Sequence, residues 1–215
     1  MDDMLPLIDS YLSRYERREE IPQFSIQQPV GSERTILYEL GEDEPEENRG
    51  YLTFARLTGT WRDRTDNMAR GIICDVLTGG NEAPLKRKAL ERGLVQDLSI
   101  SIDDTILQSW VTIHAENVTD GRETEIRELI RETGEEILRN GIDRKAVEAS
   151  MNRAVFALRE EEEPQGIGRC IRCTGNWLYG SDPTDALESA DMVRELKEYL
   201  ENGRFDKLAA DMLLN

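Results

Sequence analysis

Histidine is almost absent from this sequence: His114 is the only one among 215 residues. A hydrolytic zinc site needs about three protein ligands, commonly two histidines and a carboxylate, with a fourth position open for water. A two-histidine zinc site is therefore excluded. A serine triad would have to use the same histidine, and no serine nucleophile elbow is present. We expect His114, alone in a strand pattern, to be a structural or surface residue.

Basic side chains are also scarce, with 27 Lys and Arg against 44 Asp and Glu and a formal net charge of -17. Proteins bind nucleic acids and anionic membranes chiefly through basic side chains, so this balance argues against both as general partners. The run Lys86-Arg87-Lys88 is a local exception. Three charges inside a helix are typical of a solvated face.

Long apolar runs and a secretory leader are missing as well. No apolar run approaches the roughly 18 residues of a membrane span. The start, Met1-Asp2-Asp3-Met4, lacks the basic residues of a signal peptide. Three cysteines, an odd number, without a secretory context indicate reduced thiols. We therefore expect a soluble, acidic, cytoplasmic protein.

The cysteines carry no clear chemistry. Cys170 and Cys173 have the spacing of a zinc knuckle, but no second Cys or His pair accompanies them. Positions three apart share one face of a helix, so we expect both thiols to pack inward. A nucleophile pair could combine His114 with Cys74, Cys170 or Cys173, yet nothing in the sequence places any such pair together.

Two other stretches could suggest a ligand site. Thr78-Gly79-Gly80-Asn81 is rich in glycine but lacks the Lys-Ser/Thr of a phosphate-binding loop. The acidic run Glu160–Glu163 is more typical of a solvated helix end than of a calcium site. Taken alone, the chain is expected to hold no catalytic residue and no metal ligand.

The stretch Gly71–Val118 organises the predicted fold. Helical patterns on both sides of the glycine break are followed by alternating apolar residues, a turn at Asp103-Asp104 and a long strand pattern. One face of that strand carries Leu107, Ser109, Val111, Ile113 and Ala115, and the other carries Gln108, Trp110, Thr112 and His114. The first face is the better candidate for packing under helices.

Two more strand candidates, Thr35–Leu40 and Tyr51–Trp61, precede this unit, with a polar loop at Gly41–Gly50 between them. Strands therefore flank the helices of Asp66–Gly93. We predict an α+β fold with a mostly antiparallel sheet and helices packed on one face.

The C-terminal half is predicted to be helical. One helix ends at Asn140-Gly141, and Asp143 caps the next. Another helix opens at Asp182-Pro183 and stops at Asn202-Gly203, and a last helix begins near Phe205.

At the N-terminus, Met4–Arg18 reads as a helix from an upstream domain, with a linker bracketed by Pro22 and Pro29. The predicted organisation is residues 1–30 as helix and linker from a preceding domain and 31–215 as a single α+β domain. Both ends look cut from a longer polypeptide.

Several stretches, in order, resemble the presequence-protease branch of the pitrilysin/insulinase zinc metallopeptidases. They are Ala83-Pro84-Leu85 with Glu91-Arg92-Gly93-Leu94, Asn140-Gly141-Ile142-Asp143 with Phe156-Ala157-Leu158-Arg159-Glu160, Pro164-Gln165-Gly166-Ile167, Trp177-Leu178-Tyr179-Gly180-Ser181-Asp182-Pro183, and Leu213-Leu214-Asn215. The resemblance implies four related α+β domains that enclose a peptide in a chamber. It also implies a zinc site, His-x-x-Glu-His with a distal Glu, in the first domain only.

This chain contains no such motif, so the resemblance maps onto the second, non-catalytic domain, and no catalytic residue can be carried over. The implied role is a chamber wall that packs against the catalytic domain, with zinc held elsewhere in the full-length metalloendopeptidase. Peptide substrates and the remaining domains of the same polypeptide are the implied partners. We select Gln108, Trp110, Thr112 and His114 as chamber-facing candidates. The alternative is a stand-alone interaction or peptide-binding protein of the same fold.

Overall fold

The structure, a computed structural model, describes residues 4–16, 24–160 and 165–214. The α-helices are α1 (Met4–Leu12), α2 (Arg64–Thr78), α3 (Pro84–Glu91), α4 (Glu123–Asn140), α5 (Arg144–Arg159), α6 (Gln165–Leu178), α7 (Ala190–Asn202) and α8 (Arg204–Leu214). A short 3-10 helix, η1, spans Pro183–Leu187. The strands are β1 (Gly50–Thr60), β2 (Asp97–Asp103) and β3 (Gln108–Val118).

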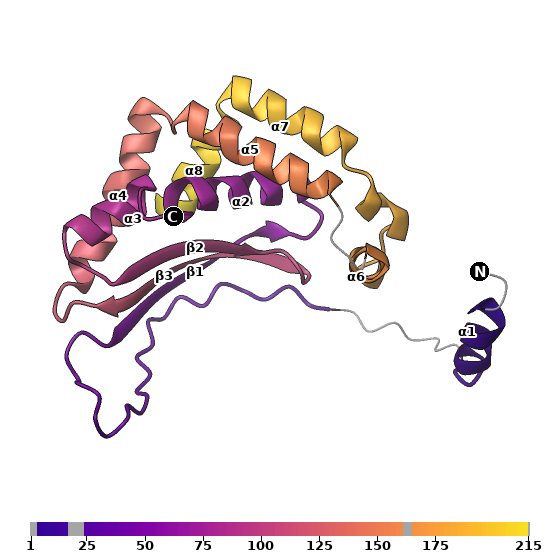
Figure 1. The fold of residues 1–215 in the computed structure, drawn as a ribbon, viewed down its shortest axis with the longest axis horizontal. Helices are drawn as coiled ribbons and strands as arrows, with labels where there is room; N and C mark the ends of the chain where they lie inside the picture. The colour runs from indigo at the N-terminus through magenta and orange to yellow at the C-terminus, as the bar shows by residue number, and fades with distance from the viewer. Residues whose placement is uncertain (1–3, 17–23, 161–164, 215) are drawn as a thin grey trace.

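The three strands form one antiparallel sheet in the order β1-β3-β2. Figure 1 shows the helices α2 to α5, α7 and α8 on one face of this sheet. The other face is turned toward the extended segment that leads from residue 24 to β1 (Figure 1). The predicted α+β class, with helices on one face of an antiparallel sheet, is confirmed.

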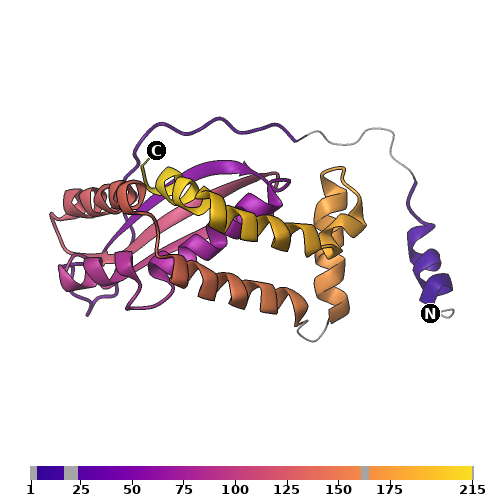
Figure 2. The ribbon, with the colours of Figure 1, turned by 90° about the horizontal axis from the view of Figure 1, so that it is seen from above.

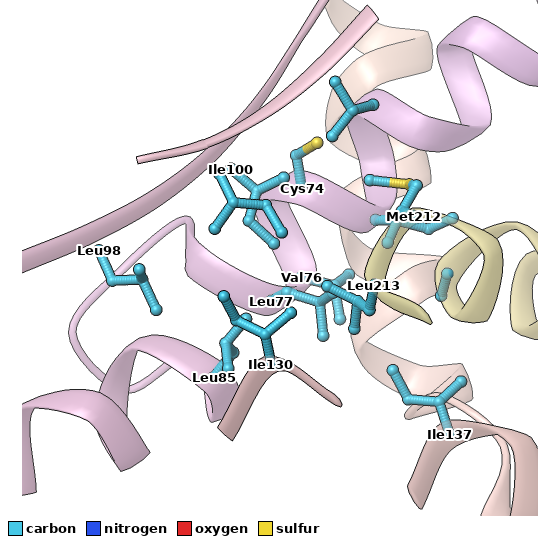
Figure 3. Close-up of a cluster of buried hydrophobic side chains, with 14 of the residues drawn as sticks. Cys74, Val76, Leu77, Leu85, Leu98, Ile100, Ile130, Ile137, Met212 and Leu213 are labelled. Atoms are coloured by element: carbon cyan, nitrogen blue, oxygen red, sulfur yellow. The ribbon is translucent and has the colours of Figure 1, made fainter. Parts of the chain in front are cut away.

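The core lies between the sheet and the helices. Val111, Ile113 and Ala115 of β3 are buried on the inner face, as their alternation predicted. Leu98 and Ile100 of β2 point the same way and meet α2 (Figure 3). Met212 and Leu213 bring α8 into the same cluster (Figure 3), which ties the end of the chain to its centre.

Several predicted helix ends are found where the sequence places them. Asp143 caps α5, because its carboxylate accepts hydrogen bonds from the backbone N–H groups of Lys145 and Ala146 at 2.9 and 3.2 Å. Gly203 ends α7 with a φ of 72°, a left-handed conformation that glycine adopts without strain.

The predicted strand at Thr35–Leu40 is wrong. This segment is extended but forms no strand, and Ile36 and Leu37 are 83% and 93% exposed. An extended run becomes a strand only when its backbone pairs with a neighbour, and no backbone hydrogen bond joins this segment to β1 among the described residues. Arg127 holds the segment instead, with Nη2 2.6 Å from Glu33 Oε1.

Two helix predictions also need correction. The helix expected to open at Asp182-Pro183 is only the single turn η1, and α7 starts separately after an extended Glu188. Near the N-terminus, α1 ends at Leu12 and every one of its residues is exposed. Figures 1 and 2 both show α1 lying apart from the sheet and its helices.

Arg18, Pro22 and the acidic run beyond Glu160 lie outside the described residues. The proposed boundary at residue 30 stays a prediction. None of the described helices combines the length and apolar character that crossing a bilayer requires.

Candidate functional site

The four chamber-facing candidates lie in one row on the outer face of β3. Gln108, Trp110, Thr112 and His114 are all partly buried, and they alternate with buried residues of the inner face. Across the sheet His114 is paired with Thr53 of β1 and Ser99 of β2. The structure therefore brings the four together, while their role toward a peptide stays a prediction.

Side chains around His114 hold it in place. Its Nδ1 lies 2.8 Å from Thr53 Oγ1, and its ring stacks on Tyr51 with centroids 5.7 Å apart. Its Nε2 lies 3.8 Å from Glu116 Oε1. At the other end of the row, the Gln108 side chain exchanges two hydrogen bonds with the backbone of Gln27, at 2.6 and 3.2 Å. These contacts fasten the extended segment to the sheet.

The cysteines do not assemble with His114. Cys74 is buried in the core on the inner side of the sheet, and burial raises the pKa of its thiol to about 12. Cys170 is exposed and Cys173 half-buried on α6, so the prediction that both thiols pack inward is wrong for Cys170. The side of a helix that packs against the domain depends on how the whole helix is placed, which the spacing of the two cysteines does not specify.

A metal centre is not formed by the part of the chain that the structure describes. Within residues 4–16, 24–160 and 165–214, no group of three or more His, Cys, Asp or Glu side chains is placed to hold a metal ion.

Two hollows lie at the end of the sheet where β1 leads into α2. One cavity of about 670 Å³ lies between α2 and α6, and its apolar lining includes Met68, Ile102, Leu158 and Ile171. A second cavity of about 970 Å³ adjoins it between α2, η1 and α7. Trp61 and Arg64 line both cavities, so the two adjoin. We call the pair the end groove.

The walls of the end groove are fixed by the turn after β1. The Asp63 carboxylate accepts a hydrogen bond from the Thr60 backbone N–H at 2.7 Å, and the Asn67 amide donates to the Thr60 carbonyl at 2.9 Å. This turn holds Trp61, only 8% exposed, at the junction of the two cavities. The Trp61 ring meets that of Tyr179 with centroids 5.6 Å apart, which connects the turn to the segment after α6.

Arg64 joins the two sides of the groove. Its guanidinium donates to the backbone carbonyls of Asp185 at 2.6 Å and Glu188 at 3.0 Å. On the same wall, Thr65 donates from its hydroxyl to Glu195 at 2.6 Å. Single residues of α2 thus position η1 and the start of α7.

A charge network lies behind this wall. Arg204 Nη2 is 2.5 Å from Asp66 Oδ2, and the buried Arg70 lies 3.9 Å from the same oxygen. Partial burial raises the pKa of Asp66, but the hydrogen bonds from Arg204 and Tyr199 and the charge of Arg204 outweigh it and hold the pKa below its usual value. Asp66 is therefore ionised at neutral pH and serves as a structural anion.

The sequence pattern does not predict the end groove. Its residues come from four separate parts of the chain, and none belongs to a motif with known chemistry. One stretch of sequence does point to the groove. Trp177 to Pro183 is among the stretches that resemble the presequence-protease branch, and it includes Tyr179, which lines the groove. Trp61, the last residue of the strand candidate Tyr51–Trp61, is the other usable signal.

The fold and the site thus define an α+β domain with helices on one face of an antiparallel sheet and a groove at the sheet end. Residues 1–154 match the family model of the Peptidase M16 inactive domain. The chain belongs to this family, and the resemblance stated from the sequence is confirmed.

Curated relatives agree with this assignment. The chain is 27% identical over 212 residues to Protein HypA of Clostridium perfringens, which covers 96% of this chain and 22% of that protein. It is 30% identical over 161 residues to presequence protease 1 of Arabidopsis thaliana, covering 71% of this chain and 15% of that protein. The chain therefore spans about a fifth or less of the length of these relatives.

Solved structures show the same fold. The inactive peptidase domain of a Bordetella parapertussis protein superposes with a TM-score of 0.58 at 9% identity, covering 77% of this chain and 84% of that one. An M16-like protein from Alicyclobacillus acidocaldarius gives a TM-score of 0.54 at 18% identity, covering 75% of this chain and 37% of that one.

Proposed function

We propose that this chain is a non-catalytic wall domain of a zinc-dependent metalloendopeptidase that degrades unstructured peptides in an enclosed chamber. In this proposal the domain packs against a catalytic domain of the same polypeptide. Zinc is held by that other domain, and this chain alone is inactive. The family match over residues 1–154, to a domain described as inactive, is the observation that carries the proposal.

Two features of the chain support a role in shape rather than chemistry. Its lone histidine is held by Thr53, Tyr51 and Glu116. Its buried thiol, Cys74, has a pKa of about 12 and is therefore protonated at neutral pH, whereas the thiolate is the reactive form.

Reconstitution tests the proposal. The 215-residue chain would be assayed alone, and again together with the catalytic part encoded by the same reading frame, for zinc content and for cleavage of an unstructured peptide. Cleavage that needs both parts, and zinc bound only by the other part, supports the wall role. A reading frame without any zinc-peptidase motif would contradict it.

The acidic balance of -17 suggests a preference for basic peptides, because a wall of one charge sign raises the local concentration of oppositely charged substrates. The full-length enzyme should then cleave basic peptides faster than acidic ones, and added salt should reduce the difference. Cleavage rates that depend on neither peptide charge nor salt concentration would contradict this part of the proposal. A cytoplasmic location is part of the same proposal, and the odd number of cysteines supports it.

The second candidate function is a stand-alone peptide-binding protein of the same fold. The end groove favours it, because a groove can bind a peptide without any catalytic partner. The two candidates separate on whether the reading frame continues into a His-x-x-Glu-His motif.

A further inference from the structure

We propose that the end groove binds an unstructured peptide segment in which a basic residue lies next to an apolar side chain. This inference rests on the proposed function only in taking an unstructured peptide as the partner. It concerns a surface on the helical side of the sheet, distinct from the outer row that includes Trp110 and His114.

Size and placement make the end groove suitable for a peptide. Its cavities of about 670 and 970 Å³ fall in the range of roughly 300 to 1,000 Å³ that ligand sites occupy. Since Trp61, Arg64 and Asn176 line both, the two cavities lie side by side. Neighbouring residues of one extended peptide can therefore each occupy one of them.

The cavity between α2 and α6 is suited to an apolar side chain. Met68, Ile102 and Leu158 form its walls, and Ile171 of α6 lies on its rim with 67% of its surface exposed. Burial of a leucine-sized side chain against such a surface contributes favourably in proportion to the apolar area removed from water. Arg169 and Arg172 also line this cavity.

The adjoining cavity has the opposite character. Its lining includes six carboxylates, Asp63, Asp66, Asp185, Glu188, Asp191 and Glu195, against the two arginines Arg62 and Arg64. Asp66 and Asp191 are paired with Arg204 and Arg194.

By contrast, the side chains of Asp185 and Glu188 make no hydrogen bond or ion pair with the part of the chain that the structure describes. Their hydrogen bonds to Arg64, to Asp182 and to each other use backbone groups. Two unpaired carboxylates beside an apolar cavity complement a basic residue next to an apolar one.

Fluorescence anisotropy with a defined probe tests the proposal on the whole 215-residue chain. The probe is a labelled Gly/Ser peptide with a central Leu-Leu pair and Arg residues on both sides. We expect saturable binding that weakens as salt is added. A peptide with Glu in place of Arg, or with Ser in place of the Leu pair, should bind at least about tenfold more weakly.

Two sets of variants localise the binding. The double variant Asp185→Asn/Glu188→Gln removes two exposed, unpaired charges and should weaken the Arg probe about tenfold. The matched control, Glu42→Gln/Asp43→Asn, removes the same charge from an exposed loop far along the chain and should leave binding unchanged. Ile171→Ser should weaken the Leu-containing probe but not the Ser-containing one.

The proposal is overturned by equal binding of the Arg and Glu probes, or by equal losses in the groove and loop variants. Its failure is distinguishable from failure of the proposed function. A chain that supports cleavage by the catalytic part without binding the probe contradicts the groove alone. A chain that cleaves peptides by itself contradicts the wall role, whatever the probe does.

Discussion

Arg204 and Asp66 are 138 residues apart in sequence, and their side chains meet at 2.5 Å, joining the first turn of α8 to the first turn of α2. Asp66 is largely buried, with 18% of its side chain exposed. The pair also supplies a counter-charge to the buried Arg70, whose Nε has no hydrogen-bond partner among the described residues. Loss of the Asp66 charge should therefore affect both α2 and α8.

We predict that Asp66→Asn lowers the free energy of unfolding by about 1 to 3 kcal/mol at pH 7, because two guanidinium groups lose their anion. The folded-state pKa of Asp66 is below its usual value, so its contribution is present above the unfolded pKa near 3.8 and is lost as the pH falls through the folded pKa.

Urea unfolding as a function of pH measures this. The difference between wild type and Asp66→Asn should shrink as the pH falls below about 4. The control variant Asp43→Asn, in an exposed loop, should match wild type throughout. A pH-independent difference for Asp66→Asn would show that its charge is not the cause.

Two glycines in helices should respond in opposite directions to the same change. A Cβ on Gly134 of α4 would lie 2.7 Å from Leu214 Cγ and 3.1 Å from Leu213 Cβ, so α8 would have to move. A Cβ on Gly168 of α6 meets nothing within 4 Å among the described residues.

We expect Gly134→Ala to destabilise the fold by about 1 to 2 kcal/mol, and Gly168→Ala to stabilise it by about 0.5 to 1 kcal/mol. Thermal unfolding of both variants would check this, and a Gly134→Ala variant more stable than wild type would refute the close α4–α8 packing.

The three thiols should react at very different rates with a disulfide reagent. Cys170 is exposed and Cys173 half-buried, whereas Cys74 is buried with its pKa raised to about 12. Because the thiolate is the reacting form, we expect rapid modification at Cys170 and reaction at Cys74 only on unfolding. Absorbance titration of the native and urea-unfolded protein counts the thiols, and Cys74→Ser should remove only the slow one. Fast loss of all three native thiols would contradict the core placement of Cys74.

The isolated chain should associate with itself as its concentration rises. Exposed apolar side chains gather on α1, including Leu5 and Leu12, and on α6, including Ile167 and Trp177, with exposed fractions of 60% or more. Large unpartnered apolar surfaces favour association. Light scattering over a concentration series should show a rising mean mass, and the double variant Leu5→Ser/Leu12→Ser should reduce it. A strict monomer at high concentration would disprove the expectation.

The sheet could be predicted from sequence because its information is local. Alternation along β3 separates Val111 and Ile113 from Trp110 and Thr112, and the structure buries the first pair and leaves the second half-exposed. Helix ends such as Asp143 and Gly203 are equally local, since a cap depends on residues within one turn.

The errors and omissions concern contacts between distant segments. Thr35–Leu40 has a strand-like composition, but a strand also needs a paired edge, which a single segment does not specify. Similarly, Cys170 and Cys173 share a helix, yet which side meets the domain depends on how α6 is placed. The end groove combines Trp61 with Leu187, residues far apart in sequence, so no spacing pattern could have predicted it.

Zinc analysis and a peptidase assay on the 215-residue chain, repeated after adding the catalytic part of its own polypeptide, test the proposed role as a non-catalytic wall domain most directly. We expect substoichiometric zinc and no cleavage for the chain alone, and chelator-sensitive cleavage once the two parts are combined. Stoichiometric zinc and chelator-sensitive cleavage by the chain alone would contradict it.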